Sequence, residues 1–363
     1  MIYIAIFILV FTLIQLLVAL TNLLTKTHLP STGKNSDLLV SVLIPARNEE
    51  KNIGNILEDI ISQNYNNIEV IIFNDNSDDL TAEIVTKYTI SDSRFKLINS
   101  EKLPEGWSGK NHACHTMAAC AKGQYLLFLD ADVRIGNDLI GDAVQYAEKR
   151  KTGLISIFPE QIIESFGEEI TVPNMNYILL SLLPLPLVRL SSFPSLAAAN
   201  GQFMFFNAEI YRNLKPHEIM KASKVEDIEI SRYLKKNKIS VACLLGDSRI
   251  RCRMYSGFSD SVNGFSKNVV AFFGNSFLLA VLFWLITSFG FLAVMMAMSG
   301  LVLIAYLVLY LTTRVLISIA SHQNVLKNLL YMLPLQLSMG LFIRKAFINR
   351  YFGKFEWKGR SLN

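Results

Sequence analysis

The stretch that decides the fold is Tyr125-Leu126-Leu127-Phe128-Leu129-Asp130-Ala131-Asp132, an apolar run that ends in two acidic residues. A short apolar run of this kind predicts a buried strand. Two carboxylates one residue apart at the end of a strand can present oxygen atoms to one divalent cation, which can also hold a diphosphate. The same acids can instead cap the strand or begin the next helix, so the surrounding sequence has to separate the two interpretations.

Around this stretch, residues 38–268 alternate short β-branched runs with amphipathic ones. This alternation predicts an α/β domain whose parallel sheet is covered by helices on both faces. The predicted strands include 39–45, 68–73, 95–99 and 202–206, and the predicted helices include 53–61, 81–88 and 228–236. Ligands of such sheets bind at the carboxyl ends of the strands, where Asp75 and Asp132 both lie.

The chain is too apolar for an ordinary soluble enzyme, with 51% hydrophobic residues and a mean hydropathy of +0.33. Residues 1–25 contain an uncharged run from Ile2 to Leu24, long enough to span a bilayer. The run lacks a basic start and a small-residue cleavage site, so it predicts a membrane anchor and not a cleaved signal peptide. Lys26 and Lys34 follow it and place the next domain in the cytoplasm by the positive-inside rule.

Residues 276–348 form a predicted C-terminal membrane region. The almost uncharged run from Ser276 to Ala320 predicts two helices with a turn near Met298-Ser299-Gly300. A third apolar stretch, 329–343, contains Pro334 and either spans the membrane or lies at its interface. The basic tail 349–363 should be cytoplasmic, which requires an even number of crossings after the domain and favours a re-entrant or interfacial third stretch. The sequence thus predicts a multi-pass protein of the cell membrane.

Inside the predicted α/β domain, residues 173–196 form another apolar stretch, interrupted by three prolines. Two interpretations remain open: a segment that lies at the membrane interface, or a helix buried in the core of an elaborated domain. The net charge of +5 is modest, and it is explained by the basic residues that any membrane protein carries on its inner side. It does not call for a nucleic acid partner.

The motifs of the domain, in their order along the chain, carry a resemblance to a known family. They are Pro45-Ala46-Arg47-Asn48-Glu49, Asp75-Asn76-Ser77-Asp78-Asp79, Gly109-Lys110, Asp130-Ala131-Asp132 and Glu226-Asp227. From Ser41 to about Asn268 the chain resembles family-2 glycosyltransferases of the GT-A fold. This implies a Rossmann-like catalytic domain between N-terminal and C-terminal transmembrane helices.

A narrower likeness points to membrane-anchored enzymes that glycosylate isoprenoid lipids, including carotenoid and hopanoid-associated glycosyltransferases. It rests on three further stretches, Gly106 to Cys114, Gly264-Phe265-Ser266-Lys267-Asn268 and Glu356-Trp357-Lys358-Gly359-Arg360. The resemblance implies a nucleotide sugar donor, a membrane lipid acceptor and a Mg²⁺ or Mn²⁺ cofactor.

Carried over by residue, the resemblance implies that Asp132 binds the metal ion that bridges the diphosphate, while Asp130 positions the ribose or sugar. The loop at Pro45 and the side chain of Asp75 would bind the nucleoside. One departure is Asn74, where many relatives have a further aspartate, although an amide can still form hydrogen bonds. The residues expected to bind the donor are Pro45, Arg47, Glu49, Asp75, Lys110, Asp130, Arg253 and Lys267.

Glu226 and Asp227 open a predicted helix, where acids usually act as caps or dipole partners. The resemblance implies a catalytic role for the pair. Asp227 would be the general base that takes a proton from the acceptor hydroxyl as this hydroxyl attacks the anomeric carbon. The reaction would invert the anomeric centre without a covalent intermediate.

Three cations have alternative interpretations. Lys110 stands at a glycine-rich helix entrance, where it can reach the donor phosphates or remain a solvated side chain. Arg253 and Lys267 precede the first C-terminal membrane helix and can either neutralise the diphosphate or contact lipid headgroups. The Gln-Xaa-Xaa-Arg-Trp motif of relatives that make polysaccharides is absent from this region, which favours transfer of a single sugar.

Two further side-chain types stand near the glycine-rich stretch. Trp107 either lines the pocket of the sugar or acceptor, or packs over the sheet. His112 and His115 have a spacing that can hold a metal, but no third ligand is evident nearby in the sequence.

The first hypothesis is therefore a membrane-bound, metal-dependent, inverting hexosyltransferase that acts on a lipid hydroxyl or carboxylate, with UDP-glucose as the expected donor. An alternative enzyme makes a polyisoprenyl-phosphate sugar, whose acceptor is already an anion. The third hypothesis is a membrane scaffold that binds nucleotide or a partner enzyme without catalysis.

Overall fold

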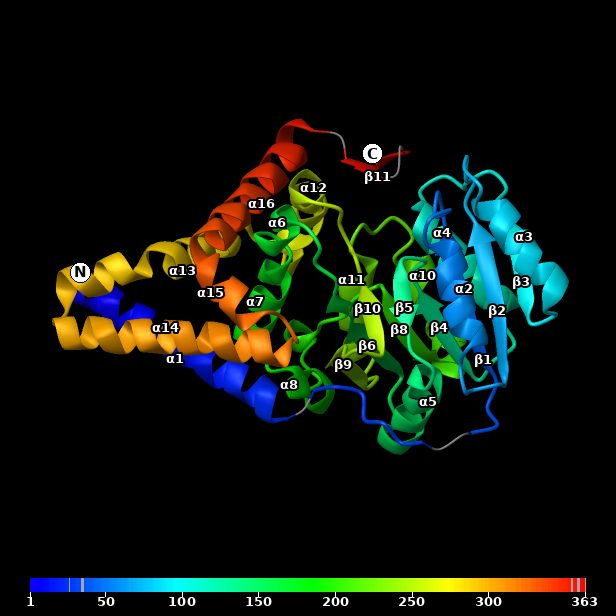
Figure 1. Cartoon of the computed structure of the whole chain (residues 1–363), viewed down its shortest axis with the longest axis horizontal. Helices are drawn as coiled ribbons and strands as arrows, with labels where there is room; N and C mark the ends of the chain where they lie inside the picture. The colour runs from blue at the N-terminus through cyan, green and yellow to red at the C-terminus, as the bar shows by residue number, and fades with distance from the viewer. Residues whose placement is uncertain (26, 34–35, 354, 358–359, 363) are drawn as a thin grey trace.

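The computed structural model describes residues 1–25, 27–33, 36–353, 355–357 and 360–362. It has two parts, an α/β domain and a bundle of long helices that extends from one side of this domain (Figure 1). Lys26, Lys34, Lys358 and Gly359, on which part of the orientation and tail predictions depend, lie outside the described residues.

A seven-stranded sheet forms the centre of the described domain. Its strands are β1 (Val40–Ala46), β2 (Ile68–Asn74), β3 (Phe95–Asn99), β4 (Tyr125–Leu129), β6 (Leu154–Phe158), β8 (Phe203–Asn207) and β9 (Val241–Leu245). They lie in the order β3-β2-β1-β4-β8-β6-β9. A small sheet joins β5 (Val133–Ile135), β10 (Ile250–Cys252) and β7 (Glu160–Gln161), and β11 (Phe355–Trp357) pairs with β12 (Arg360–Leu362).

The prediction of a parallel sheet is wrong for one strand. β8 runs antiparallel to both of its neighbours, β4 and β6, while the other pairings in this sheet are parallel. The chain leaves β6, passes through several helices and returns in the opposite direction. An apolar strand that is buried on both faces does not encode its own direction, because the connection decides it.

Helices cover both faces of the sheet. One face packs against α2 (Ile53–Ile61), α3 (Thr81–Ser91) and α5 (Leu139–Arg150), and the other against α4 (Gly109–Cys120), α7 (Pro173–Leu182), α8 (Leu185–Leu190), α9 (Ala208–Leu214) and α11 (Glu226–Lys236). Along β4 the side chains alternate between the two cores, with Leu127 in one and Phe128 in the other. Short helices complete the domain: α6 (Phe166–Glu169), α10 (Pro216–Ile219) and the 3₁₀ turn η1 (Pro194–Leu196).

The apolar stretch 173–196 divides into two parts. In α7 every residue from Pro173 to Ser181 is buried, and the helix packs against the bundle, so this half is the core helix of an elaborated domain. After α7 the chain exposes apolar side chains, with Leu190 66% and Phe193 67% exposed. The interfacial assignment stays a prediction for this second half.

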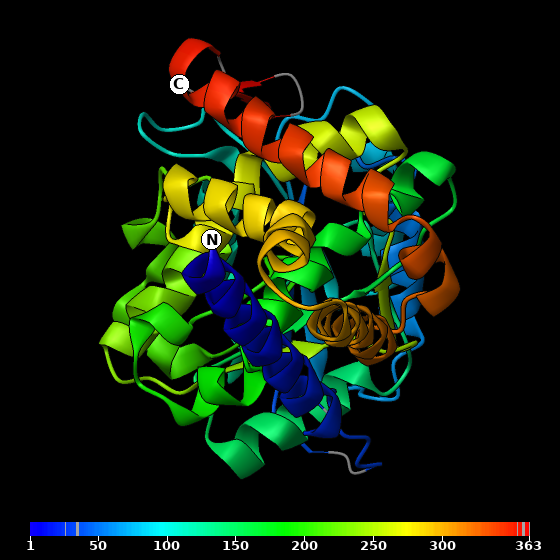
Figure 2. The ribbon, with the colours of Figure 1, turned by 90° about the vertical axis from the view of Figure 1, so that its left-hand side faces the viewer.

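Three described helices are long and apolar enough to cross a membrane: α1 (Ile2–Leu24), α13 (Phe277–Ala297) and α14 (Gly300–Ala320). They lie side by side (Figure 2). α12 (Phe258–Asn268) and η2 (Val269–Phe273) connect the domain to α13. After α14 come α15 (Val325–Leu330) and α16 (Met332–Phe352). The predicted third stretch, 329–343, begins at the end of α15 and continues into α16. α16 runs obliquely across the end of the bundle and packs on α12 and α13 (Figure 2).

Candidate active site

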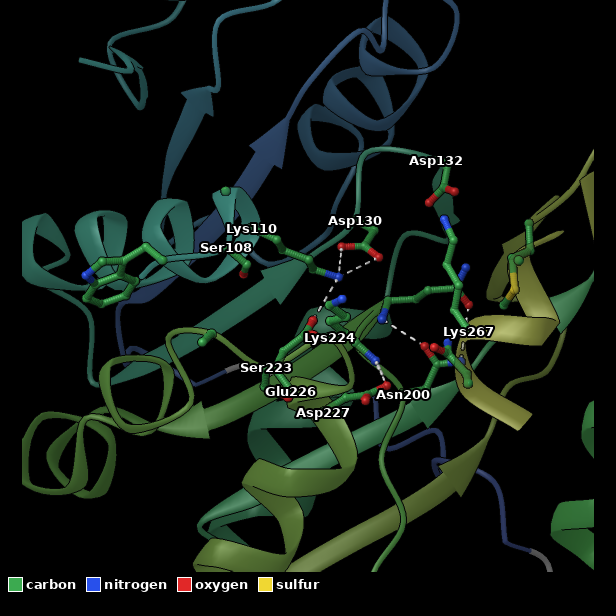
Figure 3. A pocket seen from close by; sticks show the side chains of 18 of the residues that line it. Ser108, Lys110, Asp130, Asp132, Asn200, Ser223, Lys224, Glu226, Asp227 and Lys267 are labelled. Carbon is green, nitrogen blue, oxygen red and sulfur yellow. Dashed lines mark hydrogen bonds and ion pairs between the residues drawn. The ribbon is translucent and has the colours of Figure 1, made fainter. Parts of the chain in front are cut away.

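A cavity of about 470 Å³ opens where β4 ends (Figure 3). It is bounded by the loop before α4, the turn after β4, the start of α11 and the side of α12. The residues that line it are Leu103, Gly106, Trp107, Ser108, Gly109, Lys110, Asp130, Asp132, Asn200, Gly201, Gln202, Ala222, Ser223, Lys224, Glu226, Asp227, Met254, Tyr255, Gly264, Lys267 and Asn268.

The two acids of the sequence motif occupy a tight turn between β4 and β5. The backbone N–H of Asp130 donates to the carbonyl of Gln202 at 3.2 Å, and the N–H of Val133 donates back to the Asp130 carbonyl at 3.3 Å. β5 then pairs with β10, which fixes the far side of the turn. Both carboxylates therefore face the cavity from one rigid corner of the sheet, as Asp-Xaa-Asp spacing predicted.

Lys110 lies in the first turn of α4, a helix that Ser108 caps by accepting a hydrogen bond from the Asn111 N–H at 3.3 Å. Its Nζ is 2.8 Å from an Asp130 oxygen and 3.5 Å from Glu226 Oε1. Burial opposes the charge, yet the two carboxylates hold the pKa of Lys110 well above its ordinary value. Lys110 is thus a paired cation that joins the corner after β4 to the start of α11, and not a solvated side chain.

Asp227 stands at the start of α11, on the opposite side of the view from Asp132 (Figure 3). One carboxylate oxygen accepts from the Gly201 N–H at 3.0 Å, and the other from the Ile228 N–H at 2.8 Å. Burial, together with the neighbouring charge of Glu226, raises the pKa of Asp227 to about 7. A carboxylate with this pKa can accept a proton near neutral pH.

Gly201 is a site residue that the sequence reasoning missed. A Cβ atom at this position would lie 3.1 Å from Lys110 Nζ and 3.5 Å from Glu226 Oε1. Glycine therefore lets the backbone approach these side chains and donate its N–H to Asp227. The only sequence signal was an isolated glycine just before a strand, which indicates a close backbone approach.

The wall of the cavity on α12 depends on a second glycine. A Cβ atom at Gly264 would overlap the ring and the hydroxyl of Tyr255. We expect Gly264→Ala to lower the free energy of unfolding by about 1 to 3 kcal/mol, because the ring or the helix must move. Thermal unfolding in detergent measures this change. Gly300→Ala is the matched control, because nothing lies within 4 Å of its added Cβ atom. Equal stabilities of the two variants would contradict the assigned packing.

The residues predicted to bind the nucleoside gather at the carboxyl ends of β1 and β2, beside the corner after β4, but do not line the cavity itself. Arg47 Nη1 donates to the Asp75 carbonyl at 2.7 Å, and the Glu49 N–H donates to Thr81 Oγ1 at 2.8 Å. These contacts hold the loop after β1, which follows Pro45, against the loop after β2. Asp75 is only 3% exposed.

Asn74, the last residue of β2, acts as a turn residue. Its side-chain oxygen accepts from the Ser77 N–H at 3.1 Å, and its amide donates to Asn99 Oδ1 at 3.0 Å. Its side chain thus ties the loop after β2 to the neighbouring strand β3.

The structure places Arg253 and Lys267, two cations that precede the first C-terminal apolar helix, in different surroundings. Lys267 lines the cavity. Arg253 is absent from the lining residues; its Nη2 is 2.9 Å from Glu168 Oε1, and its Nη1 also pairs with Glu164. Glu168 of α6 and Glu164, which precedes this helix, hold the Arg253 side chain. The structure therefore does not place Arg253 with the other residues that were predicted to bind the donor.

Trp107 lies at the cavity and packs against helix α4, and the prediction that it lines the pocket of the sugar or acceptor stays a prediction. It lines the cavity, and its ring packs 5.6 Å from that of His112 and 5.1 Å from that of His115, centre to centre. The two histidines therefore support the tryptophan from α4.

A divalent cation fits this site only when the phosphates of a bound substrate supply some of its ligands. Within the described ranges no group of three or more His, Cys, Asp or Glu side chains is placed to hold a metal ion. In enzymes that bind substrate phosphates, Mg²⁺ is usually held by one or two carboxylates, the phosphates and water. Asp132, which lines the cavity at the turn after β4, fits as a protein ligand of a metal-diphosphate complex.

The carboxyl edge of the α/β sheet carries acidic turns and a buried carboxylate. Helices that are long and apolar enough to cross a membrane lie beside the domain. Together these features define a class of membrane-associated α/β enzymes. Residues 41–215 match the sequence model described as Glycosyl transferase family 2. The protein is a glycosyltransferase.

Relatives with assigned names agree with this. The chain is 27% identical over 354 residues to a 4,4'-diaponeurosporenoate glycosyltransferase of Staphylococcus aureus (strain USA300), covering 89% of this chain and 88% of that protein. A protein of the same name from Staphylococcus haemolyticus (strain JCSC1435) is 26% identical over 277 residues, covering 72% of this chain and 71% of that protein.

Among solved structures, the mannosyltransferase PcManGT from Pyrobaculum calidifontis, in complex with GDP-Man and Mn²⁺, covers 96% of this chain and 98% of its own. The TM-score is 0.55 at 16% identity. This likeness confirms the GT-A fold that the sequence motifs predicted.

Proposed function

We propose that the protein transfers a single hexose, with inversion, from a nucleotide-diphosphate sugar to an isoprenoid lipid of the membrane, and that UDP-glucose is its donor. The observation that carries the proposal is the position of Asp227. Its carboxylate is fixed by the Gly201 N–H, has a pKa near 7 and shares one cavity with the acidic turn after β4. A base and a diphosphate-binding corner on one cavity are what direct displacement at an anomeric carbon requires.

Each residue then has a role. The loops after β1 and β2, with Arg47, Glu49 and Asp75, bind the nucleoside. Lys110 and Asp130 hold the sugar and the diphosphate, and Lys267 adds positive charge at the α12 wall. Asp227 removes the proton of a hydroxyl acceptor as the acceptor oxygen attacks; a carboxylate acceptor is already an anion and needs no such step.

Asp132 would hold Mg²⁺ or Mn²⁺ together with the donor phosphates. When bound, the cation stabilises the negative charge that grows on the departing diphosphate. The neighbour PcManGT is described in complex with GDP-Man and Mn²⁺, which supports a divalent cation here as well.

The acceptor proposal rests on the relatives and on the position of the cavity. The names of the relatives specify diaponeurosporenoate, a carotenoid-type carboxylate. In this chain Lys267 and Asn268 line the cavity at the end of α12, and η2 and the membrane helix α13 follow at once. An acceptor can therefore keep its apolar tail in the bilayer while its polar end enters the cavity.

We further propose that the catalytic domain faces the cytoplasm, where nucleotide sugars are made, with three helices crossing the membrane. Arg344 and Lys345 belong to α16, which packs on α12, and Lys345 donates to Asn263 of α12; these cations agree with this orientation under the positive-inside rule.

The pH dependence should report Asp227. Only its deprotonated form is a base, and its pKa is about 7. We expect kcat/KM to fall about tenfold per pH unit below pH 7 and to level off above it. Initial rates between pH 5 and 9 measure this profile.

Lys110→Met provides the check. The positive charge of Lys110 lowers the pKa of Asp227. Loss of this charge in Lys110→Met should therefore move the acidic limb of the pH profile to higher pH. An acidic limb that stays in place in this variant would show that another group controls the profile.

The deciding experiment incubates membranes containing the protein with radiolabelled UDP-glucose, Mn²⁺ or Mg²⁺, and a lipid extract from cells that lack the protein. Label that enters an organic-phase lipid only with the intact protein supports the proposal, and the mass of the product identifies the acceptor. Transfer only from GDP-mannose or another donor would replace the proposed sugar. Donor binding without transfer to any lipid would support the scaffold alternative instead.

A further inference from the structure

A positively charged side chain lies inside the helical bundle, apart from the catalytic cavity. Arg314 belongs to α14, which is apolar enough to cross a membrane, and it is 4% exposed. A guanidinium does not lose its proton in proteins. A permanent charge in such surroundings is costly unless an anion or several polar groups compensate it.

The contacts of Arg314 provide only partial compensation. Its Cζ lies 3.7 Å from the centre of the Tyr177 ring, and its Nη2 donates to the hydroxyl of Tyr310 at 3.0 Å. Tyr310 is shared, because Gln336 Nε2 donates to the same hydroxyl at 3.1 Å. Among the residues that the structure describes, no carboxylate forms an ion pair with Arg314.

Three buried polar atoms around this cation have no hydrogen-bond partner within the described chain: Arg314 Nε, the Tyr177 hydroxyl and Gln15 Nε2. They come from α14, α7 and α1, which pack on one another. The Gln15 amide and the Arg314 guanidinium both lie beside the Tyr177 hydroxyl without reaching hydrogen-bond geometry. Each of the three atoms can donate a hydrogen bond, so together they call for an acceptor-rich, negatively charged group.

The depth of this cluster fits a lipid. Arg314 lies about 9 Å before the end of α14 at Ala320, taking 1.5 Å per residue. The end of α14 and the helix α7 lie where the bundle meets the domain (Figure 1). The polar end of a lipid is found at such a depth, and tyrosines are common there.

We propose that Gln15, Tyr177 and Arg314 bind the oxyanion, phosphate or carboxylate, of one membrane lipid between α1, α7 and α14. None of the three lines the catalytic cavity, so this lipid site is separate from the acceptor position. The inference does not depend on the identity of the sugar or the acceptor. A lipid held here joins the bundle to α7 of the catalytic domain.

Native mass spectrometry of the full chain in detergent tests the site, with phosphatidylglycerol, oleate and diacylglycerol as probes. We expect one retained molecule of an anionic probe and at least tenfold weaker binding by Arg314→Gln. Arg344→Gln, which removes an exposed cation of α16, should bind as the unaltered protein does. A preference for phosphatidylglycerol identifies a phosphate ligand, and a preference for oleate identifies a carboxylate.

Tyr177→Phe keeps the ring over Arg314 and removes only the hydroxyl, so it tests the site even if Arg314→Gln does not fold. We expect several-fold weaker binding of the anionic probe by this variant. Unchanged binding by Tyr177→Phe would show that the Tyr177 hydroxyl does not bind the lipid, and equal retention of diacylglycerol would show that the site does not select an anion; either result would overturn the proposal.

Discussion

Asp227→Asn is expected to lower kcat for transfer to lipid by about 10²- to 10⁴-fold, the usual range for loss of a positioned base. An amide has nearly the same shape as the carboxylate but cannot accept the acceptor proton. The oxygen of the new amide can still accept a hydrogen bond from one of the two N–H groups that now hold Asp227, so the start of α11 should remain folded. Single-turnover assays with a radiolabelled donor measure the rate, and calorimetric titration with UDP checks that donor binding persists.

Glu229→Gln is the matched control for this variant. Glu229 is also in the first turn of α11 but does not line the cavity, so its loss changes the charge near the helix start without touching the proposed base. We expect it to retain most of the activity. If Asp227→Asn transferred sugar almost as fast as the unaltered protein, the acceptor would already be an anion. A carboxylate acceptor or the polyisoprenyl-phosphate alternative would then be favoured.

Asp132→Ala should remove metal-dependent transfer, with a loss of about 10²- to 10⁴-fold in kcat/KM. The cation and its ligand act where charge develops in the transition state, so several kcal/mol of stabilisation are lost with them. Chelation of the unaltered protein with EDTA should abolish transfer, and added Mn²⁺ or Mg²⁺ should restore it. The electron paramagnetic resonance signal of free Mn²⁺, recorded with UDP present, should fall with the unaltered protein and stay high with Asp132→Ala.

Asp138→Asn serves as the control for this experiment, because Asp138 is an exposed acid six residues further along that does not line the cavity. It should bind Mn²⁺ and transfer sugar normally. Normal Mn²⁺ binding by Asp132→Ala would assign the cation to other groups, and EDTA-resistant transfer would remove the cation from the reaction.

Local sequence patterns were sufficient for most elements of the catalytic domain. The predicted strand 95–99 is found as β3, and the predicted helix 53–61 is found as α2. These elements were readable because side-chain periodicity follows from backbone geometry within each segment. The motif of Asp130 and Asp132 was readable for the same reason, since a strand that ends in acids places them at the carboxyl edge of the sheet.

Contacts between distant segments were not readable from the sequence. Lys110 pairs with Asp130 and Glu226, which are 20 and 116 residues away, whereas Arg253 turns instead to the acids around α6. The sequence left both cations with open alternatives because their partners come from other elements. Gly201 shows the same limit, since only folding brings its N–H to Asp227.

The sequence by itself thus determined the kinds of elements, the order of the acidic motifs and the long apolar helices, because each depends on residues that are neighbours in the chain. The tertiary structure alone decided the antiparallel direction of β8, the burial that brings the pKa of Asp227 to about 7, and the enclosure of Arg314 between α1, α7 and α14. Direction, desolvation and charge pairing depend on which distant segments meet, and no local pattern records that.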